Sequence, residues 1–310
     1  MGDSAIVTGG AGFIGSHVAD ALLADGDAVT VVDDLSTGRA ERVPDGAELR
    51  QLDIVDAAAL QRVFDELAPD VVYHLAAQAS VVASVEDPGR DCDVNVRGTL
   101  NVLEAAGRHG APVVFTSTGG ALYGDAAPMP TPEDRIPAPL SPYGASKWAA
   151  EAYVRTWALS SGIAHAVCRL GNVYGPRQSP HGEAGVVAIF TGRIAEGRAP
   201  TLYGQGKPTR DYIHVADVVS ALKATRGKPG VFNIATGRQT DVITIWRTLT
   251  RVAGVQIEPK LADLRPGELQ HSCLDISRAE RELGWRPQIE IEHGLELTYR
   301  ALMQEIEQQA

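Results

Sequence analysis

The first half of the chain alternates short runs of β-branched residues with longer segments of helical periodicity. The apolar runs predict buried strands at Ala5–Thr8, Ala28–Asp33, Leu49–Leu52, Val71–Leu75, Pro112–Ser117 and Ala164–Leu170. Between them, apolar residues three and four positions apart predict helices that begin near Phe13, Ala57, Pro88 and Pro142. This alternation predicts an α/β fold with a parallel, doubly wound sheet of the Rossmann type, covered by helices on both faces.

The pattern changes after Asn172, where glycine- and proline-rich segments such as GNVYGPRQSPHGEAG and LYGQGKPTR replace the regular alternation. Segments of this composition seldom form the strands of a sheet. We therefore expect a Rossmann domain over residues 1–171, to which segments near 213–236 return, and a smaller, mainly substrate-binding lobe over residues 172–310. No repeat or flexible linker separates the two parts, so we expect them to pack together.

Composition narrows the classes of function. With 310 residues, 44% of them apolar, the chain can fill a sizeable core. Its formal net charge of -11 argues against a nucleic-acid surface and leaves small molecules as the expected partners. No apolar run approaches the roughly 20 residues that span a bilayer, and we identify no signal peptide. Widely spaced Cys92, Cys168 and Cys273 indicate neither disulfides nor a metal site, so we expect a cytoplasmic protein.

A glycine-rich loop joins the first predicted strand to the first predicted helix. In TGGAGFIGS, Gly9 permits a tight turn, Gly12 lets the backbone approach a pyrophosphate, and Gly15 allows close contact between helix and strand. The amino end of the helix, at Phe13 and Ile14, then faces the anion. Glycine-rich turns are common in α/β proteins, so the loop alone is equally consistent with a plain turn.

A carboxylate at the end of the second predicted strand favours a dinucleotide-binding loop over a plain turn. Asp33 stands at about the 20-residue offset of a group that bonds the adenosine ribose 2′-OH and repels a 2′-phosphate, which favours NAD over NADP. A turn-capping role remains open for Asp33, and Asp34 beside it keeps that alternative alive. Residues after the third and fourth predicted strands are also expected to line the cofactor: Asp53, Ile54, Leu75, Ala76 and Ala77.

The segment SPYGASK contains a candidate catalytic pair. Tyr143 and Lys147 stand four residues apart, so on a helix their side chains share a face. A phenol has a pKa of about 10 and serves as a base at neutral pH only where a nearby ammonium favours its ionised form. The spacing also occurs by chance in surface helices. Here it follows a strand ending at Ser117 and Thr118, and such strand ends are where doubly wound folds bind ligands.

The chain resembles the extended short-chain dehydrogenase/reductase family, and within it the bacterial UDP-glucose 4-epimerases. The resemblance runs from about Ile6 to Trp285 and rests on ordered segments: TGGAGFIGS, VVDDLSTG, YHLAAQ, NVRGTLNVLEAA, STGGALYG, SPYGASK, NVYGPRQ and TRDYIHVADVV. It implies NAD-dependent 4-epimerisation of a UDP-hexose through a transient 4-keto sugar, with UDP-glucose and UDP-galactose as the interconverted pair.

Catalytic roles follow from the resemblance. It implies that Tyr143 is the acid/base and that Lys147 lowers its pKa and bonds the nicotinamide ribose. Thr118, with or without Ser117, would bond the sugar 4-OH. The STGGALYG loop is one residue longer than the commonest family version, which leaves the choice between these two open. Asn95, in NVRGTLNV, would lie in the cofactor site.

Substrate-binding residues are implied in the same way. Asn172, Arg210 and Arg265 resemble family contacts to the substrate diphosphate, and guanidinium groups suit phosphate oxygens. A turn cap or a solvated charge is the alternative for each. Ser272, seven residues after Arg265, takes a position that in the family lies against the sugar's C2 substituent, where a tyrosine blocks an N-acetyl group. The N-acetylated pair of UDP-hexoses is therefore also expected to be accepted.

Two further expectations concern histidines and assembly. His74, His165 and His214 lie in apolar stretches and are predicted to be buried structural residues rather than ligands. The helices beginning near Pro88 and Pro142 carry apolar residues on more than one face. Family members pair these helices, which predicts a homodimer.

Alternative functions remain at this point. A UDP-glucuronate 4-epimerase would need only one additional carboxylate contact in a loop, and a decarboxylase of the same sugar acid is a further, less favoured alternative. In the family's sugar-nucleotide 4,6-dehydratases an Asp-Glu pair follows the catalytic threonine, whereas Gly119 and Gly120 follow Thr118 here. A catalytically silent NAD-binding regulator would lack the tyrosine or the lysine, and both are present.

Overall fold

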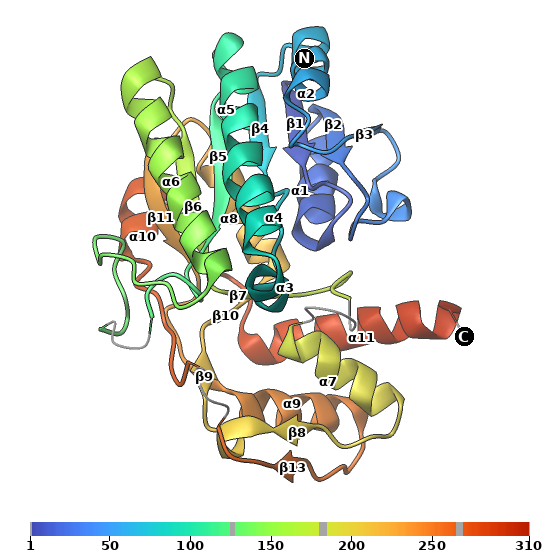
Figure 1. The fold of residues 1–310 in the computed structure, drawn as a ribbon. Coiled ribbons are helices and arrows are strands. Elements are labelled where there is room, and N and C mark those ends of the chain that lie inside the picture. The colour runs from blue at the N-terminus through green and yellow to red at the C-terminus, as the bar shows by residue number, and fades with distance from the viewer. Residues whose placement is uncertain (1, 125–127, 180–184, 265–268, 310) are drawn as a thin grey trace.

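A computed structural model describes residues 2–124, 128–179, 185–264 and 269–309. Its centre is a seven-stranded sheet in the order β11-β6-β5-β4-β1-β2-β3, in which every neighbouring pair is parallel. The strands span β1 Ser4–Thr8, β2 Ala28–Asp33, β3 Glu48–Gln51, β4 Val71–His74, β5 Val113–Thr118, β6 Ala166–Leu170 and β11 Gly230–Ile234. The chain thus forms the doubly wound sheet that the alternating pattern predicts (Figure 1).

Helices cover both faces of this sheet (Figure 1). Because strand side chains alternate, Ala5 and Val7 of β1 pack on one face with Val18 and Leu22 of α1, whereas Ile6 faces the other. The first face is covered by α1 Phe13–Ala24, α8 Val215–Ala224 and α10 Ser277–Leu283. The second is covered by α2 Ala57–Leu67, α5 Gly98–Arg108 and α6 Pro142–Ser161.

The predicted elements match the observed ones closely. Four helices begin where the spacing predicts, at Phe13, Ala57, Pro88 and Pro142. Strand bounds agree within about two residues, the largest difference being at β6, which starts at Ala166. The patterns did not predict α3 Val81–Glu86 as a separate helix before α4 Pro88–Cys92. This helix is short and exposes its valines, so it lacks the buried stripe on which such predictions depend.

Short strands and three further helices form a lobe beneath the sheet (Figure 1). Its strands pair in twos, β7 Asn172–Tyr174 with β10 Tyr212–His214, β8 Thr201–Leu202 with β13 Lys260–Leu261, and β9 Thr209–Arg210 with β12 Thr240–Asp241. Its helices are α7 Val186–Ala195, α9 Val242–Ala253 and α11 Ile291–Gln309. They enclose a separate apolar core around Trp246 and Phe190, whose rings meet edge to face at 5.3 Å.

The three histidines are buried, as predicted. His74 bonds Thr8 through Nδ1 and Thr99 through Nε2, at 2.7 and 3.0 Å, which links β1, β4 and α5. Burial lowers the pKa of His74 to about 3 and the pKa values of His165 and His214 to about 4. All three cysteines are unpaired. Within the described ranges, no helix is both long and apolar enough to cross a bilayer.

Candidate active site

The glycine-rich loop is shaped by positions that cannot hold a side chain. Gly9 has φ +71°, and a Cβ there would lie 2.6 Å from the Ala76 amide nitrogen. At Gly15 a Cβ would lie 2.1 Å from the Gly9 carbonyl oxygen, so α1 packs directly on the loop. Gly12 is the N-cap of α1, and no side chain caps the helix end at Phe13 and Ile14. This backbone cradle is suited to an anion such as a pyrophosphate.

Asp33 binds the loop, whereas Asp34 does not. The Asp33 carboxylate is buried at the end of β2 and accepts hydrogen bonds from the Ala11 and Leu35 amides at 3.0 and 2.9 Å. Burial raises the pKa of Asp33, an effect that these amides partly oppose. Asp34 is exposed and accepts from the Ser36 amide and hydroxyl at 2.9 and 2.7 Å. Asp33 is therefore the carboxylate positioned beside the cradle.

The other predicted cofactor residues lie in different settings. Leu75, Ala76 and Ala77 follow β4 and are half-buried, with the Leu75 amide bonded to the Thr8 carbonyl next to the glycine loop at 3.0 Å. Asp53 is exposed and accepts from the Val55 amide at 2.9 Å, which forms a local turn.

Ile54 and Asn95 turn their side chains toward the protein. Ile54 is buried, and a Cβ on Gly98 would lie 2.5 Å from its Cδ1. The Asn95 amide is 1% exposed and is engaged with the backbone of Gln78 on both sides, at 3.0 Å each. Asn95 thus fixes the loop that follows the predicted cofactor-lining residues.

The candidate catalytic pair lies on the first two turns of α6, which Ser141 caps by accepting from the Gly144 amide at 3.2 Å. Burial raises the pKa of Tyr143 to about 12, and a hydrogen bond with Thr118 partly opposes this. Lys147 is 2% exposed, and its Nζ lies 4.2 Å from the centre of the Phe115 ring. Burial lowers the pKa of Lys147 to about 7, against the opposing charges of Glu151 and Asp91.

Ser117 and Thr118 point in different directions at the end of β5. Ser117 is 4% exposed, and its Oγ has no partner among the residues that the structure describes. Thr118 is half-buried, accepts from the Ala121 amide at 3.2 Å and shares a hydrogen bond with Tyr143. The structure therefore brings Thr118, rather than Ser117, to the tyrosine.

Of the three residues predicted to bind the substrate diphosphate, Asn172 and Arg210 lie in the described chain. Asn172 begins β7, and its Oδ1 would lie 3.4 Å from a Cβ on Gly120, so this glycine leaves the amide room. Arg210, on β9, is half-buried and donates to the Thr209 carbonyl at 2.9 Å. Arg265 lies outside the described residues.

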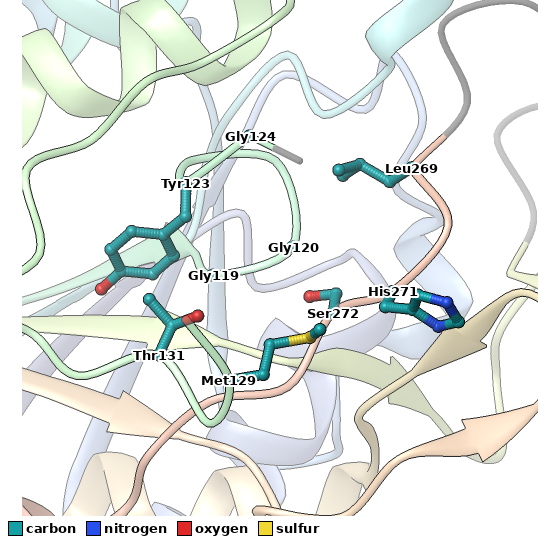
Figure 2. Close-up of a pocket in the computed structure, with 9 residues that line it drawn as sticks. All are labelled: Gly119, Gly120, Tyr123, Gly124, Met129, Thr131, Leu269, His271 and Ser272. Carbon is teal, nitrogen blue, oxygen red and sulfur yellow. The ribbon is translucent and has the colours of Figure 1, made fainter. Parts of the chain in front are cut away.

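Ser272 lines a pocket with the two glycines that follow Thr118 (Figure 2). The remaining lining residues are Tyr123, Gly124, Met129, Thr131, Leu269 and His271. The His271 ring is engaged elsewhere, because its Nδ1 lies 2.9 Å from the Thr209 hydroxyl. Tyr174 is absent from this lining and stacks edge to face on His214 at 5.4 Å. Neither ring fills the space beside Ser272.

A buried polar network behind the pair was not predicted from the sequence. Glu151, one turn after Lys147, accepts from Arg169 Nη2 at 2.7 Å, and Arg169 also reaches Tyr123 of the pocket. Asp91 of α4 is 1% exposed and accepts from Gln78 Nε2 at 2.8 Å. Charged residues in helical segments are ordinarily predicted to lie at the surface. The one available signal was the four-residue spacing of Tyr143, Lys147 and Glu151, which places the three side chains on one helix face.

The whole chain is similar to characterised enzymes. It is 44% identical to the UDP-glucose 4-epimerase of Mycolicibacterium smegmatis over 302 residues, covering 94% of this chain and 96% of that protein. It superposes on the Thermotoga maritima UDP-glucose 4-epimerase solved with UDP-glucose, with a TM-score of 0.95, 44% identity and coverage of 98% and 99% of the two chains. The Thermus thermophilus UDP-glucose 4-epimerase in complex with NAD gives a TM-score of 0.90, 42% identity and coverage of 97% and 99%.

The family model described as the NAD dependent epimerase/dehydratase family matches residues 5–235. This match spans the glycine loop, the tyrosine-lysine pair and the return of the chain to the sheet at β11. The chain belongs to the NAD dependent epimerase/dehydratase family.

Proposed function

We propose that this protein is an NAD-dependent 4-epimerase that interconverts UDP-glucose and UDP-galactose. The observation that carries the proposal is the hydrogen bond between Tyr143 and Thr118. Tyr143 lies one helical turn before the buried Lys147, and Thr118 ends β5 in the same sheet whose strand β1 leads into the glycine loop. Identity of 44% to a UDP-glucose 4-epimerase along nearly the whole length supports the choice of substrate.

Proton transfer falls to Tyr143 in this proposal. Its ionised phenol accepts the proton of the sugar 4-OH and returns it to the same oxygen once the 4-keto sugar has presented its other face. Thr118 bonds the 4-OH beside it. NAD, held by the glycine loop and Asp33, would supply the oxidant for C4 and the reductant for the 4-keto sugar, so that the cycle has no net redox change.

Lys147 makes the ionised phenol attainable. Burial alone holds the pKa of Tyr143 far above neutrality, so the anion needs a neighbouring cation. Lys147 supplies it when protonated, and its ammonium would also bond the nicotinamide ribose. Asp33 would bond the adenosine ribose, with Asp53 and Ile54 near the adenine.

The diphosphate anchors would lie away from the reacting ring. We assign Asn172 and Arg210 to the substrate diphosphate, together with Arg265. Holding the diphosphate firmly while the hexose is held loosely lets the 4-keto sugar turn over. Gly119 and Gly120 offer no acid or base at the positions that follow Thr118, which disfavours dehydration.

We also propose a cytoplasmic homodimer. Trp148 and Tyr153 on α6 are each 40% exposed, and exposed apolar side chains that lie together are typical of an interaction surface. Pairing α6 and the helices after Pro88 with a second copy would cover them. Light scattering that gave a monomer mass at micromolar concentration would contradict the dimer.

The function is tested by incubating purified protein with UDP-glucose without added NAD and separating the products by chromatography. We expect UDP-galactose, because the cofactor is regenerated in each cycle and can stay bound. Mass spectrometry of the denatured protein should then detect NAD(H). Turnover of UDP-glucuronate or dTDP-glucose with none of UDP-glucose would overturn the proposed substrate.

A further inference from the structure

A buried carboxylate without a cation stands beside the catalytic pair. Asp91 is 1% exposed on α4, which packs against α6. Its Oδ1 accepts from Gln78 Nε2 at 2.8 Å and from Asn95 Nδ2 at 3.0 Å. Its Oδ2 is buried and has no hydrogen-bond partner, and no described lysine or arginine lies within 4.0 Å. A buried charge without a paired cation raises the free energy of the folded state, which indicates that the carboxylate has a function.

Asp91 is connected to the first turn of α6 through two side chains. Asn95 Nδ2 also lies 3.0 Å from the Ser146 hydroxyl, and that hydroxyl donates to the Tyr143 carbonyl at 3.0 Å. On its other side, Gln78 belongs to the loop that continues from the predicted cofactor-lining residues. The carboxylate therefore braces the tyrosine's helix turn and the cofactor loop together.

The charged and titratable groups around Lys147 come from four elements. Tyr143 and Glu151 lie on α6, Asp91 on α4, His74 on β4 and Arg169 on β6. Glu151 is neutralised by Arg169, with 2.7 Å between Oε2 and Nη2. Burial keeps His74 uncharged at neutral pH, since its pKa is about 3.

Asp91 is therefore the carboxylate near Lys147 that no described cation pairs with. Its charge acts against burial to raise the pKa of Lys147, and it adds to burial in raising the pKa of Tyr143. Both effects have the same sign, because an anion favours the protonated form of each group.

We propose that Asp91 is a positioning residue whose buried charge sets the pH window in which Tyr143 and Lys147 work as an acid/base pair. This inference rests on the proposed catalytic roles of those two residues. Asp91 keeps Lys147 protonated in a desolvated site, and its hydrogen bonds through Asn95 and Ser146 hold the tyrosine turn in place.

The test variant is Asp91→Asn in the NAD-loaded enzyme. Its carbonyl can accept the hydrogen bonds from Gln78 and Asn95, and its NH₂ replaces an oxygen that has no donor to lose. Removing the anion favours deprotonation of both catalytic groups. The two limbs of the pH profile of kcat/KM report this coupled pair, and both limbs should move to lower pH by roughly one unit.

Asp87→Asn is the matched control. Asp87 caps α4, is exposed and accepts from the Arg90 amide at 2.9 Å. Asparagine caps helices as well as aspartate does, so this variant removes the same charge at the same helix without changing a buried site. Its pH profile of kcat/KM should coincide with that of the wild type.

A second measurement does not depend on turnover. Tyrosinate absorbance of the holoenzyme is titrated with and without Tyr143→Phe, and the difference reports Tyr143 alone. We expect its midpoint to fall in Asp91→Asn. If Asp91→Asn loses its cofactor, Asp91→Ser removes the same charge with a smaller side chain, and the same fall is expected.

An unmoved midpoint, or a profile lowered at every pH without displacement, would show that Asp91 acts only as a structural brace and would overturn the inference. Retained activity in Tyr143→Phe would instead remove the proposed acid/base, whatever Asp91 does. The two failures are therefore distinguishable.

Discussion

The end of the site that would bind the cofactor is formed mainly by backbone, whereas the end that would bind the sugar is formed mainly by side chains. At the cofactor end, backbone dominates: Gly9 and Gly15 have no room for a Cβ, and Asp33 is held by two amides. At the sugar end, half-buried side chains dominate, as with Arg210 and Ser272, which come from a two-residue strand and a loop. A backbone cradle fixes one ligand shape, whereas side chains around a cleft can be exchanged without rebuilding the fold.

The residue at the junction of the two ends should show the largest effect. We expect Tyr143→Phe to lower kcat by about 10²–10⁴-fold, because it removes the proton-transfer group. Cofactor content and UDP affinity should be kept, since the anchors at both ends remain. Steady-state kinetics and calorimetric titration with UDP measure the two quantities.

Tyr153→Phe is the control for this change, because Tyr153 lies on the same helix, is exposed and stacks on Trp157 at 6.2 Å between ring centres. It should leave kcat unchanged. A Tyr143→Phe variant with more than about a tenth of wild-type activity would lie outside the range for a general acid/base and would reject the mechanism.

At the sugar end, Arg210→Ala should act on binding. Loss of charge-assisted hydrogen bonds to a diphosphate costs about 1.5–3 kcal/mol, so KM for UDP-glucose should rise roughly 10- to 150-fold with kcat nearly kept. The comparison variant is Arg198→Ala, whose side chain is 66% exposed and pairs with Glu196. If kcat fell while KM stayed constant, Arg210 would belong to the reacting end instead.

At the cofactor end, Gly15→Ala should act on the backbone. The added Cβ would lie 2.1 Å from the Gly9 carbonyl oxygen and 2.8 Å from Gly10 Cα, so the loop or α1 must shift. Overpacking of this kind costs about 1–3 kcal/mol, and we expect a lower free energy of unfolding together with loss of copurified NAD(H).

Gly107→Ala separates this clash from the general effect of alanine in a helix. A Cβ at Gly107 meets nothing within 4 Å, so this variant should be stabilised by about 0.5–1 kcal/mol. Denaturant unfolding of both variants gives the comparison. Equal stabilities would mean that the Gly9–Gly15 contact is not a constraint on the cradle.

The same contrast between local backbone patterns and side chains brought together by packing explains which features could be predicted from the sequence. The strands and the glycine loop are local patterns, so their positions followed from periodicity and from residues that steric limits select. The choice of Thr118 over Ser117 could not, because the two neighbours alternate across the end of β5 and the register with β6 decides which one meets Tyr143. Asp91 and Glu151 were also missed, since a carboxylate becomes a buried partner only once distant elements pack around it.

The smallest expected effect lies at the sugar end, in substrate selection. Ser272 and the two glycines after Thr118 leave a pocket that neither His271 nor Tyr174 occupies (Figure 2). Ser272, Gly119 and Gly120 place no ring against this pocket, so none of the three blocks a substituent there. We therefore expect UDP-N-acetylglucosamine to be accepted beside UDP-glucose, and Ser272→Tyr to remove the former selectively. Ser272→Ala, which keeps the space, should retain both.

The expected change in substrate preference follows from how strongly steric exclusion can discriminate between two substrates. A ring that excludes one substituent in a pocket discriminates by about 1–3 kcal/mol, so the ratio of kcat/KM for the two substrates should change roughly 10- to 200-fold in Ser272→Tyr. Activity on UDP-glucose serves as the internal reference, because a variant that loses both substrates has disturbed the pocket as a whole. An unchanged ratio would mean that Met129 or another lining residue, and not Ser272, limits the substituent that the pocket accepts.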